Sequence, residues 1–177
     1  MNKPVKRLCI CAMFTALIFV ITVFVSVPAG PVGNINLGDA FIIIATFVLG
    51  PYGAIAGGVG AMLADLISAY AVYAPATLVI KSLLAIACYY VYKVFKRIIR
   101  FDYISRLIGA ICGELVMVIG YFLYEGILYG FANALISVPF NLIQGGAAVT
   151  LGTIVSFLLL KNILLLLTTG LLLLFLL

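Results

Sequence analysis

Six apolar runs separated by short polar connections are the feature that most constrains how this chain folds. The first run, from Leu8 to Val27, is about 20 residues long, which is the length that an α-helix needs to cross a bilayer core. Hydrophobic residues make up 67% of the sequence and charged residues only 8%, and a soluble domain of 177 residues cannot cover so much apolar surface. We therefore predict an all-α integral membrane protein built as a bundle of six transmembrane helices.

The predicted helices cover roughly residues 8–27, 40–49, 52–71, 76–94, 107–129 and 133–160. The second is short for a full span, so we expect it to start inside the bundle, to be tilted, or to begin near Ile35. Residues 1–161 then form a single membrane domain. Residues 162–177 are a Leu-rich apolar tail, separated from the sixth helix by Lys161 and Asn162 and too short for a comfortable seventh span, and its role stays open.

The third predicted helix carries two ridges of small residues at a spacing of four. One consists of Gly53, Gly57 and Ala61, and the other of Ala56, Gly60 and Ala64. Small residues at this spacing let neighbouring helices approach closely, so we expect tight packing around this helix.

Nine of the ten basic residues precede the first run, lie from the end of the fourth run to the start of the fifth, or follow the sixth. With six crossings all nine face the same side, so the positive-inside rule predicts that both termini are cytoplasmic. The connection from Lys93 to Arg106 is basic and amphipathic, and we expect it to lie on the inner leaflet or to contact a cytoplasmic partner. We expect no nucleic-acid-binding groove of basic residues with interleaved aromatics, so the net charge of +5 does not indicate nucleic-acid binding.

Polar residues embedded in the apolar runs mark the candidate site, because charge inside a membrane is usually retained for function. Glu114, Tyr121 and Glu125 are spaced seven and four apart and share one helix face, although Glu125 also suits the outer water interface. We expect a substrate site drawn from Asn34, Asn36, Asp39, Tyr73, Lys81, Glu114, Tyr121, Glu125, Asn141 and Gln144.

Lys81 and Asp65 are predicted to lie at similar depths, since each residue of a helix advances about 1.5 Å. Two interpretations stay open at this point. Lys81 forms a structural ion pair with Asp65, or it reaches a ligand with Asp65 as its counter-charge.

Catalysis is not indicated. The chain has no His, its four cysteines have no metal-ligand spacing, and it lacks a phosphate-binding loop of the Gly-x-x-x-x-Gly-Lys type. We therefore expect neither an enzyme nor a metal or cofactor in this chain, and any ATP must be used by partner subunits.

Several short motifs together resemble the substrate-binding S components of energy-coupling factor (ECF) vitamin transporters, most closely the riboflavin- and pyrimidine-type branch. They are Ala12-x-x-x-Ala16, Asn-Leu-Gly-Asp39, Leu49-Gly-Pro-Tyr-Gly, Ala64-Asp65 and Tyr73-Ala-Pro75. The resemblance implies a multi-pass subunit of a bacterial plasma membrane that binds a vitamin under the loop between the first two helices. It also implies docking through Ala12 and Ala16 onto a shared T subunit driven by two ATPases.

The substrate is less constrained. Four embedded acids against Lys81 favour a neutral or weakly cationic ring, and tyrosines are available for stacking because the chain has no Trp. We expect a hydroxymethylpyrimidine- or pyridoxine-like ring, with riboflavin or thiamine as alternatives. A stand-alone proton-coupled secondary transporter and an intramembrane enzyme are the other classes considered, and the missing inverted repeat and missing catalytic sets count against them.

Overall fold

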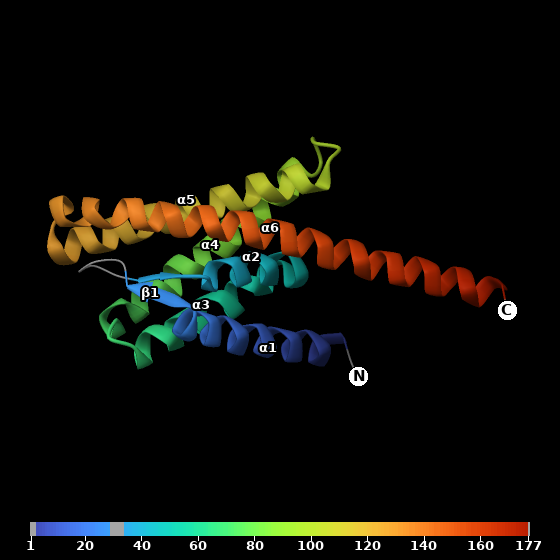
Figure 1. Ribbon diagram of the computed structural model, residues 1–177, viewed down its shortest axis with the longest axis horizontal. Helices are drawn as coiled ribbons and strands as arrows, with labels where there is room; N and C mark the ends of the chain where they lie inside the picture. The colour runs from blue at the N-terminus through green and yellow to red at the C-terminus, as the bar shows by residue number, and fades with distance from the viewer. Residues whose placement is uncertain (1–2, 29–33, 177) are drawn as a thin grey trace.

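The computed structural model is a bundle of long α-helices with one short β-hairpin at one end (Figure 1). It describes residues 3–28 and 34–176, with side chains described over 4–27 and 35–162. The elements in order are α1 (Lys3–Phe24), β1 (Ser26–Pro28), β2 (Asn34–Asn36), α2 (Gly38–Leu49), η2 (Gly50–Tyr52), α3 (Gly53–Ile67), η3 (Ala71–Tyr73), α4 (Ala74–Phe95), α5 (Asp102–Tyr129) and α6 (Phe131–Leu176).

Helices α2 and α3 form a tight antiparallel pair around the predicted Gly-Pro turn. Gly50 has a φ of 65°, a backbone conformation that residues other than glycine rarely adopt. Pro51 follows it in the 3-10 turn. Beyond the turn, a Cβ on Gly53 would lie 2.6 Å from the Thr46 Cα, so only glycine permits this approach. The turn therefore returns α3 directly along α2.

The small-residue ridges of α3 pack as the sequence predicts. Gly57 faces Ile42 of α2, and Gly60 faces the Thr15 carbonyl and Ile18 of α1. On α5, Gly109 and Gly113 similarly lie against backbone carbonyls of α4. Small residues thus bring the helices close along their length, which is how helices associate where water does not drive packing.

Six α-helices are present over the described residues, but the predicted number of crossings is confirmed only in part. Five helical stretches are long and apolar enough to span a membrane, and one of them, residues 38–67, combines α2 and α3. Because α2 has 12 residues, it is about 18 Å long, well short of a core of about 30 Å. The number of crossings and the side on which each terminus lies stay predictions.

Helix α6 is longer than the sequence indicates. It continues through Lys161 and Asn162 to Leu176 and projects beyond the bundle on the side of the N-terminus (Figure 1). The predicted end of the sixth helix near residue 160 is therefore wrong, because neither Lys161 nor Asn162 breaks a helix. The assignment of 162–177 as a separate tail stays a prediction, and the side chains after 162 lie outside the described part of the chain.

The predicted polar loop between the first two helices contains strands that the sequence analysis did not anticipate. Strands β1 and β2 pair antiparallel, with Val27 opposite Ile35 and Pro28 opposite Asn34. Residues 29–33, which connect them, lie outside the described residues. The Leu37 amide donates to the Val25 carbonyl at 3.3 Å, so the hairpin is closed at its base, next to the start of α2.

The predicted basic connection is largely helical. Lys93 belongs to α4, and α5 begins at Asp102, five residues earlier than predicted. Asp102 explains the early start, because it accepts from Lys96 at 3.0 Å and from the Arg106 Nε at 2.6 Å. The Arg106 guanidinium also lies 4.8 Å from the centroid of the Phe47 ring, which ties this turn to α2.

Candidate functional site

A polar pocket opens at the hairpin end of the bundle, with a cavity volume of about 60 Å³ and a mouth that is open to solvent. Its lining comes from α1, the hairpin and all the later helices. The lining residues are Thr22, Asn36, Asp39, Ala61, Asp65, Tyr70, Tyr73, Thr77, Lys81, Tyr121, Glu125, Ser137, Phe140, Asn141 and Gln144.

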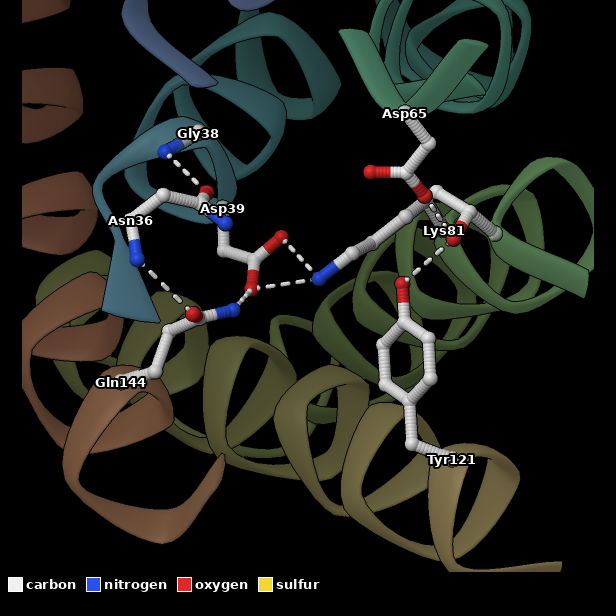
Figure 2. Close-up of polar contacts among 8 residues, drawn as sticks. Asn36, Gly38, Asp39, Asp65, Lys81, Tyr121 and Gln144 are labelled. Atoms are coloured by element: carbon white, nitrogen blue, oxygen red, sulfur yellow. Dashed lines mark hydrogen bonds and ion pairs between the residues drawn. The ribbon is translucent and has the colours of Figure 1, made fainter. Parts of the chain in front are cut away.

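Asp39 and Lys81 form the charged centre of the pocket. The Lys81 Nζ lies 2.7 Å from both carboxylate oxygens of Asp39, and both side chains are almost fully buried. Gln144 donates from its Nε2 to the Asp39 Oδ2 at 2.6 Å (Figure 2). One carboxylate at the start of α2 therefore joins α2, α4 and α6.

The same network holds the hairpin in place. Gln144 accepts from the Asn36 amide at 2.9 Å, and the Asn36 Oδ1 accepts from the Gly38 amide at 2.9 Å (Figure 2). A long-range contact to α6 thus fixes the end of β2, and the Asn36 side chain accepts from the first backbone amide of α2. The hairpin and the charged centre form one connected unit.

Asp65 does not pair with Lys81, so the ion pair considered from the sequence is wrong. Among the described residues, the acid that forms a salt bridge with Lys81 is Asp39. Asp65 accepts from the Thr77 hydroxyl at 2.5 Å, and Thr77 lies 2.9 Å from the Tyr121 hydroxyl. The hydrogen bonds from Asp65 through Thr77 to Tyr121 lie beside the charged centre, because the Lys81 Nζ is 5.1 Å from the centroid of the Tyr121 ring (Figure 2).

Tyrosines form an aromatic wall on one side of the pocket. The Tyr73 ring lies 5.6 Å from Tyr124 and 6.4 Å from Tyr121, measured between centroids, and 6.3 Å from Tyr70. The Tyr124 hydroxyl donates to the Val72 carbonyl at 2.6 Å, which anchors η3 to α5. The wall is therefore preorganised by ring packing and by one backbone hydrogen bond.

Another part of the pocket lining comes from polar side chains of α5 and α6. Glu125 is 3% exposed and accepts from the Ser137 hydroxyl, so it is buried in the bundle rather than placed at a water interface. On the same helix as Ser137, the Asn141 Nδ2 is buried without a hydrogen-bond partner among the described residues. Asn141 also belongs to the pocket lining, so an unsatisfied donor lies next to the pocket.

Most of the predicted site residues line this pocket. The lining contains the predicted residues Asn36, Asp39, Tyr73, Lys81, Tyr121, Glu125, Asn141 and Gln144. Glu114 is not in the lining: it is 4% exposed, packs against Gly145, and neither carboxylate oxygen has a hydrogen-bond partner within the described part of the chain. Asn34 pairs in the hairpin, and its side chain lies outside the described residues.

Four lining residues were not singled out from the sequence: Thr22, Thr77, Ser137 and Phe140. Thr77 precedes Lys81 by four residues and Ser137 precedes Asn141 by four, so helical spacing places each on the face of a predicted residue. That signal was available in the sequence. Thr22 and Phe140 carry no comparable signal, because a threonine or phenylalanine in an apolar helix is usually a packing residue.

The predicted docking residues lie elsewhere. Ala12 and Ala16 are exposed on α1, on the opposite side from the buried residues Phe14 and Ile18. In the described residues, no group of three His, Cys, Asp or Glu side chains is arranged to hold a metal ion.

Comparison with known proteins assigns the fold to a family. The family described as "ECF-type riboflavin transporter, S component" matches residues 2–163, nearly the whole chain. The chain belongs to this S-component family. Its members are transporter components, so this S component is a membrane transport protein and not an enzyme.

Individual relatives agree with the family. This S component is 33% identical over 149 residues to a Lactococcus lactis subsp. cremoris protein named "Thiamine precursor transporter HmpT", covering 81% of each chain. It is 32% identical over 140 residues to a Pyrococcus woesei protein described as "Uncharacterized protein in gap 3'region", covering 78% of this chain and 90% of the relative.

Solved structures share the fold. The S component of a bacterial ECF transporter superposes with a TM-score of 0.69 at 26% identity, covering 93% of this chain and 99% of that one. The S component for biotin from an ECF-type ABC transporter superposes with a TM-score of 0.51 at 22% identity, covering 88% and 94% of the chains. The second likeness concerns the fold alone.

Proposed function

We propose that this S component captures a small aromatic vitamin precursor of the hydroxymethylpyrimidine type in the polar pocket. The observation that carries the proposal is the charge of the lining. Asp39, Asp65 and Glu125 contribute three carboxylates, whereas Lys81 contributes one amine, which is already paired with Asp39. Such a pocket favours a neutral or weakly basic ring with hydrogen-bond donors over an anion.

The remaining groups suit the same ligand. Asp65 has one carboxylate oxygen beyond the one that accepts from Thr77, and that oxygen is our candidate acceptor for an exocyclic amine. The Asn141 amide is our candidate donor to a ring nitrogen or a hydroxyl. Tyr73 and Tyr121 offer faces on which a planar ring stacks.

The relationship to the L. lactis protein supports this substrate class, because that relative is named as a thiamine precursor transporter. The family name instead supports riboflavin, which is the main alternative. Riboflavin adds two further fused rings and a polyhydroxylated chain to a pyrimidine ring, so it needs a much larger cavity than hydroxymethylpyrimidine does. Pyridoxine and thiamine carry related rings and belong in the same test.

We further propose that the hairpin end faces the outside of a bacterial plasma membrane and that release requires partners. In this proposal Ala12 and Ala16 form the contact with a shared T subunit, which two ATPases drive. Both residues are exposed, and their small side chains allow a partner helix to approach closely.

The test is a ligand panel on the purified protein. Thermal unfolding in detergent is measured with hydroxymethylpyrimidine, pyridoxine, thiamine and riboflavin, while native mass spectrometry identifies any vitamin that co-purifies. We expect hydroxymethylpyrimidine to raise the unfolding temperature most, since a ligand that binds only the folded state stabilises it. Asp65→Asn should reduce its affinity about tenfold, as expected for loss of a charge-assisted hydrogen bond.

The matched control is Asp102→Asn, which makes the same chemical change at the opposite end of the bundle and should leave affinity unchanged. If riboflavin alone stabilises the protein, the proposed substrate is wrong, although the protein still captures a vitamin. If no vitamin stabilises it and none co-purifies, the pocket is not a vitamin site.

A further inference from the structure

A second depression lies at the end of the bundle opposite the polar pocket. It is formed by the first turns of α1, the turn between α2 and α3, and the last turns of α4, and we call it the basic groove. Lys6 and Arg7 supply its charge, and Leu49, Tyr52 and Tyr89 supply much of its wall. None of these residues lines the polar pocket.

The charge of the basic groove is not compensated within the described chain. Its lining contains no acidic residue. The salt bridges among described residues involve Asp39 and Asp102, and neither acid pairs with Lys6 or Arg7. A third cation lies beside the groove, because the Lys93 Nζ is 5.9 Å from the centroid of the Tyr89 ring. The groove therefore offers positive charge to an anionic partner.

The walls of the groove are apolar or amphipathic. Val48 is 38% exposed and Tyr52 is 46% exposed, so hydrophobic surface continues outward from the two cations. Tyrosine combines an apolar ring with a polar tip and is enriched where a membrane meets water. The groove thus presents cations, phenols and apolar side chains to the same occupant.

Its position along α1 matches the headgroup level of a bilayer. The apolar stretch of α1 begins at Pro4, and Lys6 and Arg7 follow within its first turn, about 3–5 Å along the helix axis. The turn that carries Arg97 and Arg100 lies at the same end of the bundle (Figure 1). Basic residues gathered at one end are typical of the side that faces the anionic inner leaflet.

We propose that the basic groove binds the headgroup of an anionic phospholipid, with Lys6 and Arg7 contacting the phosphate and the apolar wall contacting the acyl chains. Cations pair with the phosphate, the tyrosines lie at the interface, and Val48 and Leu49 meet the hydrocarbon. A bound lipid then occupies the junction of α1, α2, η2 and α4.

The test is native mass spectrometry of the purified full-length protein after incubation with phosphatidylglycerol or phosphatidylcholine. We expect the wild type to retain phosphatidylglycerol in preference to phosphatidylcholine. Lys6→Ala/Arg7→Ala should lower that retention roughly 25-fold, since each cation near an anionic surface contributes about fivefold. The matched control, Arg97→Ala/Arg100→Ala, removes two exposed cations at the same end but outside the groove, and retention should stay within about twofold of the wild type.

Four results overturn the proposal. One is equal retention of the two lipids by the wild type, and another is an equal loss in both double variants, which means only general surface attraction. The third concerns the source of the anion. If inorganic phosphate at millimolar concentration displaces the lipid completely and raises the unfolding temperature as much as the lipid does, the groove is a free-phosphate site. If the groove variant keeps its lipid but no longer assembles with a T subunit, the groove is a protein contact instead.

Discussion

Removing the amine of Lys81 gives the sharpest test of the charged centre of the pocket. Lys81→Met keeps an unbranched side chain that is one heavy atom shorter and leaves Asp39 without its ion-pair partner. At a separation of 2.7 Å and an effective dielectric constant near 20, the attraction between the two charges is about 6 kcal/mol before desolvation is considered. Desolvation offsets much of this attraction in the intact pair.

The expected loss of stability therefore comes mainly from the stranded carboxylate. Breaking a buried pair by removing one partner typically destabilises a protein by about 3–5 kcal/mol. We expect the lower end, about 3 kcal/mol, because Gln144 still donates to the Asp39 Oδ2 at 2.6 Å. The double variant Lys81→Met/Asp39→Asn has no stranded charge and should recover at least half of the loss.

The assay is denaturant-induced unfolding in detergent, followed by helical circular dichroism for the wild type, both single variants and the double variant. The free energy of unfolding from the four proteins gives the coupling energy between the two side chains. A double variant no more stable than Lys81→Met, or a single variant that loses less than about 1 kcal/mol, would refute the assignment of Asp39 as the partner of Lys81.

Three further predictions concern other parts of the chain. Glu114→Gln should change vitamin affinity less than about twofold, measured by calorimetry, because Glu114 lies outside the pocket lining; a tenfold loss would place it in the site. Ala12→Trp should leave vitamin binding intact and abolish co-purification with a T subunit, because the bulky ring occupies the exposed helix face; normal assembly would exclude that face as the contact. Gly60→Ala should lower stability by about 1–3 kcal/mol in denaturant unfolding, because its Cβ would lie 2.7 Å from the Thr15 carbonyl, whereas Gly146→Ala, with nothing within 4 Å, should be neutral or stabilising.

The membrane class and the helix packing could be predicted because both depend on local patterns. A long apolar run specifies a helix in a membrane wherever it occurs, since no other conformation satisfies its backbone. Gly57 and Gly60 likewise indicate close contacts because their spacing places them on defined helix faces. Neither inference needs knowledge of the partner helix.

The partner of Lys81 could not be predicted, because it depends on how helices rotate against one another. The sequence gives approximate depths for Lys81 and Asp65 and provides no relative orientation of α2, α3 and α4. The structure turns Asp39 towards Lys81 and Asp65 towards Thr77. Depth alone therefore selected the wrong acid.

The hairpin was missed for a related reason. Its strands have three residues each, and Pro28 and the glycines of the connection favour a loop in any local analysis. The pairing is supported by Gln144, which is 108 residues away from Asn36 in sequence. A contact of that range leaves no local pattern to detect. The end of α6 was predicted too early. Lys161 and Asn162 interrupt the run of apolar residues, but they do not interrupt the helix.

The most direct test of the central claim is the equilibrium affinity of the purified protein for hydroxymethylpyrimidine, measured by isothermal titration calorimetry beside riboflavin. The account predicts one molecule of hydroxymethylpyrimidine per chain, bound more tightly than riboflavin and about tenfold more weakly by Asp65→Asn. Tighter binding of riboflavin, or an affinity for hydroxymethylpyrimidine that Asp65→Asn leaves unchanged, would contradict it.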